Sequence, residues 1–288
     1  MILVLAGTQD GRELAAELAA AGFDLLVSTA TPYGAALLRA MAPNLAVREG
    51  RLDREALEQL LHTGPVQGLL DATHPFATAV SCLARETALC CGVPYLRWER
   101  PPVDLPESPL VHRVANWTEA AQRLAALGVR RIFLAVGVKP LDSIINHPAL
   151  DGCRFTVRVL PVPESLEICR QLGLGLDQII ACQGPGTARL NEALLEACHA
   201  EAFLIKDSGR QGGTAEKVQA ALNLRIPVVV VGRPALNEDE PGQASGGAPS
   251  RVARQADEVL SWAASLAGNS GGSGNSLARG AQILDGKV

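Results

Sequence analysis

Short apolar segments alternate with alanine- and leucine-rich segments along most of this chain of 288 residues. The apolar segments have the length of buried strands, and the segments between them have the length and apolar spacing of helices. This alternation is typical of a parallel sheet with helices on both faces. The sequence therefore predicts an α/β protein with mainly parallel sheets. Strands are expected at residues 2–6, 24–28, 45–48, 68–71, 94–97, 111–114, 131–135, 154–158, 178–182, 202–206 and 228–231.

A proline-rich stretch interrupts the alternation. Prolines stand at positions 101, 102, 106 and 109, with few apolar residues between them. Such a stretch is typical of a linker, so we expect two Rossmann-like domains with an interdomain cleft. The predicted boundaries are 1–98 for the N-terminal domain, 99–110 for the linker and 111–266 for the C-terminal domain, which ends in a helix over 252–266. Residues 267–288 are rich in Gly, Ser and Asn, and we expect a disordered tail there.

Composition and charge argue against several classes of protein. The net charge is −4 and no basic stripe is present, which argues against a nucleic-acid partner. No apolar run reaches the roughly 18 residues of a membrane-spanning helix. The strand predicted from Ile2 leaves no room for a signal peptide, so we expect a cytoplasmic protein. The seven cysteines form no CxxC pair and no metal-ligand spacing, and no metal site is predicted.

A glycine-containing turn follows the first predicted strand. Gly7, Thr8 and Gln9 lead into a helix whose free N–H groups and positive dipole suit a phosphate, and Arg12 adds a cation. The spacing is not the GxGxxG fingerprint of dinucleotide-binding proteins. The second strand ends at Ser28 without an acidic residue to bind a ribose, which favours NADPH over NADH if a dinucleotide binds. The alternative is a turn that serves only helix packing.

Two more groups of polar residues follow strands of the first half. Thr73 and His74 come after the fourth strand, just before Pro75, which can open a helix. Arg97 and Arg100 lie at and after the end of the fifth strand, and paired arginines suit carboxylates. A capping or buried histidine and an interdomain salt bridge are the alternative interpretations.

Four consecutive strands of the second half end in a cation or a Gly-Pro turn. Lys139, Arg158 and Lys206 follow or end three of them, and a Gly-Pro turn follows the fourth. A nicotinamide cofactor alone needs fewer positive groups, so we infer a second ligand with several carboxylates. Without paired carboxylates, a nucleophile or a metal box, the sequence favours hydride transfer, in which the cofactor supplies the chemistry.

The glycine-rich loop after Lys206 is the strongest candidate for binding anions. It reads KDSGRQGG over residues 206–213 and leads into a helix that carries Lys217. Its glycines would let backbone N–H groups approach a negative group. A tight strand-to-helix turn with solvated charges is the alternative.

Six sequence blocks carry a resemblance to a known family. They are ILVLAGTQDGREL at 2–14, DATHPFA at 71–77, LRWERP at 96–101, QGPGTARLNEALL at 183–195, KDSGRQGGTAEK at 206–217 and IPVVVVGRP at 226–234. With these blocks the sequence resembles the precorrin-6A reductase family of cobalamin biosynthesis from Ile2 to about Pro234. It departs from the family at Gly186, where an aromatic residue is frequent, and at Asp207, where asparagine is frequent.

The resemblance implies two Rossmann-like domains and the NADPH-dependent reduction of one double bond of precorrin-6A or its cobalt form, a tetrapyrrole macrocycle rich in acetate and propionate groups. It implies transient contacts with neighbouring enzymes of the pathway as well. His74 is then the candidate proton donor, with water or tautomerism of the ring as alternatives. The residues implied along the cofactor are Gly7, Thr8, Gln9, Ser28, Thr73 and His74. Those implied for the substrate are Arg12, Arg97, Arg100, Lys139, Lys206, Ser208, Gly209 and Lys217.

Two rival interpretations remain open at this point. One is a Rossmann-type reductase of a smaller acid, which a single anion site would suit. The other is a non-catalytic ligand sensor whose two domains close on a nucleotide.

Overall fold

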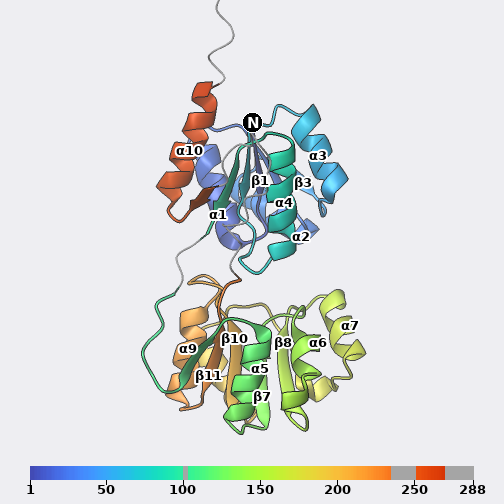
Figure 1. The fold of residues 1–288 in the computed structure, drawn as a ribbon, viewed down its shortest axis with the longest axis vertical. Helices are drawn as coiled ribbons and strands as arrows, with labels where there is room; N and C mark the ends of the chain where they lie inside the picture. Colours follow the sequence, from blue (N-terminus) through green and yellow to red (C-terminus); the bar gives the residue numbers. More distant parts are fainter. Residues whose placement is uncertain (100–102, 235–250, 270–288) are drawn as a thin grey trace, which may run out of the picture. The chain divides into compact units, whose positions relative to one another are not determined.

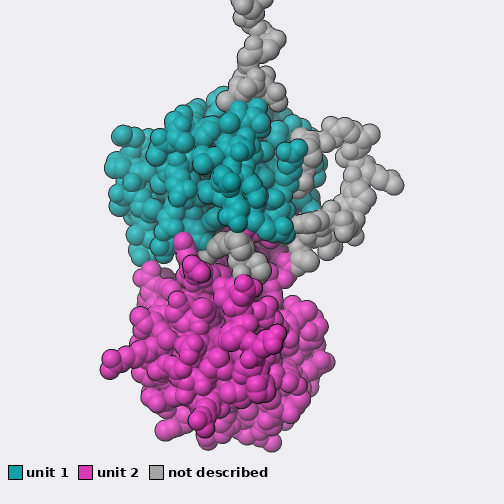
Figure 2. Space-filling view, turned by 90° about the vertical axis from the view of Figure 1, so that its left-hand side faces the viewer, with its two compact units in different colours: residues 1–72, 83–98, 246–288 teal, residues 73–82, 99–245 magenta. Residues whose placement is uncertain are grey.

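The computed structural model describes residues 1–99, 103–234 and 251–269 of the chain (Figure 1). These residues form two compact units (Figure 2). Each unit is built on a six-stranded sheet. All the strand pairs described are parallel, which confirms the predicted α/β class. No helix among the described residues is both long and apolar enough to cross a membrane. The interdomain cleft stays a prediction.

The first unit contains the described residues 1–72, 83–98 and 251–269. Its strands are β1 (Ile2–Leu5), β2 (Leu25–Thr29), β3 (Ala46–Glu49), β4 (Gly68–Asp71), β5 (Tyr95–Trp98) and β12 (Arg251–Ala253). They lie in the order β12-β5-β4-β1-β2-β3. Because β2 and β3 extend the sheet on one side of β1 while β4 and β5 extend it on the other, the strand order reverses between β1 and β4. The loops after β1 and β4 therefore meet at a topological switch point, where open α/β sheets bind ligands.

Helices cover both faces of this sheet. On one face, α1 (Gln9–Ala20), α2 (Pro32–Met41) and α10 (Ala256–Asn269) pack against apolar side chains of the sheet. On the other, α3 (Arg54–Thr63) and the part of α4 (Thr78–Cys90) that belongs to this unit pack in the same way. The side chains of Thr8, Thr31 and Asp53 accept hydrogen bonds from backbone N–H groups in the first turns of α1, α2 and α3. These caps fix where each helix begins.

The C-terminal segment differs from the prediction, which assigned it to the second domain. Strand β12 pairs with β5 of the first sheet, and α10 begins at Ala256 instead of 252. A Cβ atom on Gly68 would lie 2.4 Å from Leu266 Cδ1 and 2.9 Å from the Trp262 ring, so α10 packs directly over this glycine. Alternating apolar segments indicate strands but do not tell which sheet a strand joins. Helix α10 continues through residues 267–269 of the predicted tail, and the rest of that tail lies outside the described residues.

The second unit contains the described residues 73–82, 99 and 103–234. Its strands are β6 (Val111–Val114), β7 (Arg131–Ala135), β8 (Arg154–Val159), β9 (Ile179–Ala181), β10 (Ala202–Lys206) and β11 (Val228–Val231). They lie in the order β6-β11-β10-β7-β8-β9, so this sheet reverses between β7 and β10. The loop after β7 carries Lys139, and Lys206 is the last residue of β10. Two of the predicted cations therefore lie at the second switch point.

Helices also cover both faces of the second sheet. On one face lie α5 (Trp117–Ala126), α6 (Leu141–Ile145) and α7 (Pro163–Gln171), and on the other lie α8 (Ala188–Ala197) and α9 (Thr214–Asn223). Short 3₁₀ helices, η1 (Pro148–Leu150) and η2 (Leu176–Gln178), complete the unit. Along β8, Val157 and Val159 pack on the α5 side. Because side chains alternate along a strand, Arg158 faces the α8 side.

Candidate functional site

The predicted site residues divide between the two units. Gly7, Thr8, Gln9, Arg12 and Ser28 lie at the carboxyl edge of the first sheet. The second unit holds Lys139, Lys206, Ser208, Gly209 and Lys217, together with Thr73 and His74 from the DATHPFA block. Thr73 and His74, which the resemblance implies along the cofactor, belong to the same unit as the lysines, and their contact with the cofactor stays a prediction. Arg100 lies outside the described residues.

The first loop is held tightly against the end of β4 and leaves Gly7 open. Thr8 Oγ1 accepts a hydrogen bond from the Gly11 N–H at 3.0 Å and donates to the Ala72 carbonyl at 3.5 Å. A Cβ atom on Gly11 would lie 2.6 Å from that carbonyl oxygen, so only glycine allows this approach. Around Gly7, no heavy atom of its surroundings lies within 4 Å of a Cβ position. The loop therefore has a packed side at Gly11 and an open side at Gly7.

The open side of this loop suits an anionic phosphate. Within the described part of the chain, the backbone N–H groups of Gly7 and Gln9 have no hydrogen-bond partner. They lie at the start of α1, where the helix dipole favours negative charge. The half-buried Arg12 has an Nε with no hydrogen-bond partner among the described residues. Ser28 pairs in register with Leu5 at the same edge of the sheet and is followed by Thr29 instead of an acidic residue.

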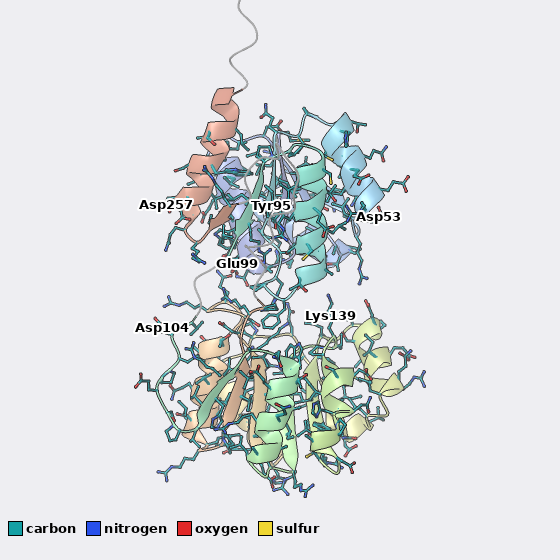
Figure 3. All side chains as sticks on the ribbon, in the orientation of Figure 1. Asp53, Tyr95, Glu99, Asp104, Lys139 and Asp257 are labelled. Carbon is teal, nitrogen blue, oxygen red and sulfur yellow. The ribbon has the colours of Figure 1, made fainter. Side chains whose placement is uncertain are left out.

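Arg97 does not form the open cation that the sequence predicts. Its guanidinium is 2.7 Å from Asp71 Oδ1, and Arg97 and Asp71 are 1% and 0% exposed. The Tyr95 hydroxyl donates to the other carboxylate oxygen at 2.9 Å, and Tyr95 lies inside the first unit (Figure 3). Burial and then the Asp71 charge raise the pKa of Tyr95. The buried ion pair holds β4 and β5 together, so we do not retain Arg97 as a carboxylate ligand.

The His74 side chain is tied to its own loop. Its Nδ1 accepts a hydrogen bond from the Phe76 N–H at 3.1 Å, which places the proton of the neutral ring on Nε2. The ring centroids of His74 and Phe76 are 5.9 Å apart, and Trp117 lies at the same distance beyond Phe76. Lys206 Nζ lies 5.2 Å from the Phe76 ring centroid, within range of a cation–π interaction. The DATHPFA loop thus brings His74 and Lys206 onto one aromatic side chain.

The three predicted lysines of the second unit form one electrostatically coupled group. Burial and, to a smaller extent, the charge of Lys139 lower the pKa of Lys206 to about 8. Burial lowers the pKa of Lys217 to about 7, with smaller contributions from Arg158 and Lys206 and an opposing one from Glu216. No salt bridge joins these lysines to a carboxylate in the part of the chain that the structure describes. Lys139 itself is exposed at the carboxyl edge of the sheet (Figure 3).

Arg158 joins this group, although the sequence marked it only as one of several strand-end cations. It is 8% exposed, and its Nη1 donates to Asn191 Oδ1 at 2.8 Å. Burial lowers the pKa of the guanidinium. The alternation of side chains along β8 could have indicated this position, because it places Arg158 on the face opposite Val157 and Val159.

The glycine-rich loop is packed more tightly than its composition suggests. Gly209 has a positive φ of 76°, which suits glycine, and its N–H donates to Asp207 Oδ1 at 3.0 Å. A Cβ atom on Gly212 would lie 2.1 Å from the Ser208 Cβ, and one on Gly213 would lie 2.3 Å from the Pro185 Cβ. Protein atoms thus fill the space of the missing Cβ at Gly212 and Gly213, and the approach of an anion to the backbone N–H groups of this loop stays a prediction. Ser208 is buried, and its N–H donates to Thr214 Oγ1 at 3.0 Å.

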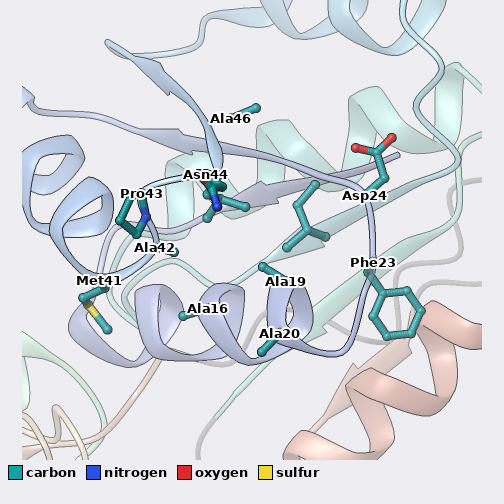
Figure 4. A pocket seen from close by; sticks show the side chains of 12 residues that line it. Ala16, Ala19, Ala20, Phe23, Asp24, Met41, Ala42, Pro43, Asn44 and Ala46 are labelled. Carbon is teal, nitrogen blue, oxygen red and sulfur yellow. The ribbon is translucent and has the colours of Figure 1, made fainter.

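In the first unit, a cavity of about 460 Å³ lies at the amino ends of β2 and β3, away from the carboxyl edge that carries Gly7 and Ser28 (Figure 4). Ala16, Ala19 and Ala20 of α1 line it, and Asp24 is its charged residue. Such a wall offers no cation for an anionic ligand. The opposite, carboxyl edge of the sheets is the usual ligand-binding edge of this architecture, and the candidate residues lie there.

The chain is similar to known proteins in sequence and in structure. The family described as "Precorrin-6x reductase CbiJ/CobK" matches residues 1–264. The chain is 38% identical to the cobalt-precorrin-6A reductase of Methanothermobacter thermautotrophicus over 82% of this chain and 77% of the relative. It is 34% identical to the cobalt-precorrin-6A reductase of Priestia megaterium (81% and 91%), and 30% identical to the precorrin-6A reductase of Rhodococcus erythropolis (82% and 90%). The solved structure of "CobK precorrin-6A reductase" superposes with a TM-score of 0.70 at 25% identity, covering 92% of this chain and 96% of that one.

Proposed function

Because the chain belongs to the precorrin-6x reductase CbiJ/CobK family, an oxidoreductase family acting on CH–CH groups, we propose that it reduces one macrocycle double bond of precorrin-6A or its cobalt form. The observation that carries this proposal is the group formed by Lys139, Lys206 and Lys217 in the second unit. Lys217 is buried and Lys206 is partly buried, and burying cations without paired carboxylates is unfavourable unless an anionic ligand compensates them. A macrocycle with many acetate and propionate groups is such a ligand.

We propose the first loop of the first unit as the cofactor-binding site. Bound NADPH would supply a hydride equivalent. Gly7, Thr8 and Gln9 would hold the pyrophosphate on the N–H groups at the start of α1, and Ser28 would lie farther along the cofactor. The absence of an acidic residue directly after Ser28 supports NADPH over NADH, because a carboxylate there would repel the extra ribose phosphate.

The second unit would bind the carboxylates of the macrocycle. Lys206 and Lys217 lose part of their charge when buried in the free protein, and a bound carboxylate would favour their protonated forms. Lys139 would contribute from the exposed side of the same edge. Ser208, Gly209, Arg12 and Arg100 stay proposed substrate contacts.

Reduction also requires a proton at the carbon next to the one that receives hydride. His74 is our proposed donor. Its Nδ1 accepts the hydrogen bond from the Phe76 N–H, so donation from this ring would use the proton on Nε2. Thr73, whose hydroxyl lies 3.2 Å from the Ser81 hydroxyl, stays a proposed cofactor contact. Water or tautomerism of the macrocycle are the alternative proton sources.

Family membership favours a tetrapyrrole substrate over the two rival functions, a reductase of a smaller acid and a ligand sensor. We further propose a cytoplasmic location and transient contacts with neighbouring enzymes of the pathway. Fractionation of the producing cells and crosslinking in them would test these two points.

The decisive experiment is turnover of purified protein with NADPH and precorrin-6A or its cobalt form in the absence of oxygen, followed by the loss of reduced nicotinamide absorbance. We expect turnover of at least one form, and no turnover of either would refute the function. Lys206→Met should raise the KM for the tetrapyrrole far more than the KM for NADPH. Arg131→Gln is the matched control. Arg131 is a half-exposed cation that pairs with Glu201, and it lies at the amino end of β7, away from the carboxyl edge of the sheet that carries Lys206. An effect of Lys206→Met confined to NADPH would contradict the assignment.

A further inference from the structure

We infer that Phe76 is a positioning residue whose ring holds the ammonium group of Lys206 next to the loop that carries His74. The part that Lys206 plays in the reaction rests on the proposed function. The contact between the ring and the ammonium group rests only on the geometry of the second unit, so the two can be tested separately.

The backbone of the loop fixes where the Phe76 side chain begins. The Phe76 N–H donates to Nδ1 of His74 at 3.1 Å, and the Ala77 N–H donates to the His74 carbonyl at 2.8 Å. Pro75, which lies between His74 and Phe76, has a fixed φ and no N–H that would need a partner. The loop is therefore a closed turn, from which the Phe76 side chain packs on the apolar cluster of the α5 face of the second sheet.

Trp117 of helix α5 supports the Phe76 ring. The two ring centroids are 5.9 Å apart and the ring planes are inclined by 44°, a tilted arrangement within the range of favourable aromatic pairs. Trp117 is the first residue of α5, and Asn116 caps this helix by accepting a hydrogen bond from the Glu119 N–H at 2.9 Å. The start of α5 thus sets the position of Trp117 and, through it, that of the Phe76 ring.

The Lys206 side chain lies over this ring. Its Nζ is 5.2 Å from the ring centroid, inside the range of about 6 Å over which the negative face of an aromatic ring attracts a cation. Lys206 is the last residue of β10 and is half-buried, and within the described residues no salt bridge joins it to a carboxylate. The ring attracts the ammonium form of Lys206 and not the neutral amine, so it favours the protonated side chain.

The charged groups around Lys206 act in the opposite direction. Burial, and after it the charge of Lys139 in the loop after β7, lowers the pKa of Lys206. Lys217 of α9 is a third cation that interacts with Lys206. The neighbouring carboxylate, that of Asp207, lies 3.7 Å from Arg233 Nε and is shared with that cation. The contact with Phe76 therefore opposes burial and two positive charges.

A ring that only fills space makes a different prediction from a ring that attracts a cation. The attraction depends on the negative charge of the ring face, which fluorine withdraws with little change in ring size. Truncation by Phe76→Ala would not separate the two roles, because water admitted to Lys206 would raise its pKa while the lost ring would lower it. A trifluorinated phenylalanine at position 76 changes the charge of the ring face and keeps the packing.

The first measurement is the pKa of Lys206 in the free protein. The chain contains four lysines, so NMR of protein labelled at the lysine side chains gives few signals, and Lys206→Arg identifies that of Lys206. The fluorinated ring at position 76 should lower the pKa of Lys206 by roughly 0.5, as for the loss of a cation–π contact. An unchanged or higher pKa would overturn the inference.

Phe133 provides the matched control. Its ring is buried in the same unit and contacts the Phe203 ring edge-on, with the centroids 5.4 Å apart. The same fluorinated residue at position 133 should leave the pKa of Lys206 unchanged. An equal change from position 133 would show a general effect of fluorine and would overturn the assignment to Phe76.

The second measurement tests whether the contact matters for the reaction. If protonated Lys206 is the active form, kcat/KM for the tetrapyrrole falls as the pH rises through the pKa of Lys206. The fluorinated ring at position 76 should move this fall to lower pH by the same amount and leave the KM for NADPH unchanged. Phe76→Tyr keeps an unfluorinated ring and should retain the pH profile of the wild type.

The outcomes separate this inference from the proposed function. If the wild type reduces the tetrapyrrole and the fluorinated ring lowers the pKa of Lys206 without moving the pH profile, the positioning role is wrong and the function stands. If the wild type reduces neither form of the tetrapyrrole while the fluorinated ring still lowers that pKa, the function is wrong and the hold of Phe76 on Lys206 stands.

Discussion

Binding of the tetrapyrrole at pH 8 should be accompanied by uptake of protons from solution. In the free protein, burial lowers the pKa of Lys206 to about 8 and that of Lys217 to about 7. Carboxylates of the ligand stay ionised at these pH values, and contact with them returns both lysines to their protonated forms. Complex formation at pH 8 then takes up about 1.4 protons, whereas complex formation at pH 6.5 takes up about 0.3.

The same linkage fixes the sign of the pH dependence. Affinity for the tetrapyrrole should fall by roughly fifteenfold between pH 6.5 and pH 8, because the free protein loses the protons that the complex keeps. The stability of the free protein should change in the opposite direction. Both folded-state pKa values lie below the unfolded value of about 10.4, so the unfolded chain binds more protons from about pH 7 to pH 10. The free energy of unfolding should rise with pH across that window.

Isothermal titration calorimetry in buffers of different protonation enthalpy measures this proton uptake directly. The titration is run with the tetrapyrrole and without NADPH. Lys217→Met should bind more weakly and take up only about 0.5 proton at pH 8, the share of Lys206. Tight binding to the wild type with no proton uptake at pH 8 would refute the assignment of these lysines to the carboxylates.

Three further predictions follow from the two units. Arg97→Met should lower the free energy of unfolding by about 3–5 kcal/mol, because it leaves the buried Asp71 charge unpaired. The folded fraction should keep its KM for the tetrapyrrole, and a selective rise in that KM would restore Arg97 as a ligand. Gly7→Ala should change the free energy of unfolding by less than about 1 kcal/mol but raise the KM for NADPH, whereas Gly11→Ala should lower the melting temperature because its Cβ would collide with a carbonyl. If the two variants had the same effects on NADPH binding and on stability, that result would count against the loop as a phosphate site. His74→Gln, whose side chain does not titrate, should lower kcat by about a hundredfold or more if His74 donates the proton, and an unchanged kcat with the same pH profile would assign that proton to solvent or the ring.

The sheets could be predicted closely because strand signals are local. All eleven predicted strands are present, each within one residue of its predicted ends. Strand β12 contains only two apolar residues, Val252 and Ala253, and Val252 also fits the apolar spacing of the helix that follows. Its pairing with β5 depends on a contact between segments far apart in the sequence, which no local pattern encodes.

The site could be predicted at the level of loops but not of individual side chains. The strand ends that carry cations could be predicted as a binding site, because ligands bind at the carboxyl edge of a parallel sheet. Whether a particular cation is open or paired depends on tertiary contacts: Arg97 meets Asp71, whereas Arg158 meets only the neutral Asn191. In the same way, Gly7 and Gly213 look alike in the sequence, yet only Gly213 has its missing Cβ replaced by a neighbouring proline.

We propose that this protein transfers a hydride from a reduced nicotinamide to the macrocycle. Mass spectrometry of the tetrapyrrole recovered after reaction with NADPH deuterated at the transferable position tests this transfer. We expect a tetrapyrrole that has gained one deuterium from the cofactor and one hydrogen from solvent. An unchanged tetrapyrrole mass, or a reduced product without deuterium when either face of the nicotinamide is labelled, would contradict it.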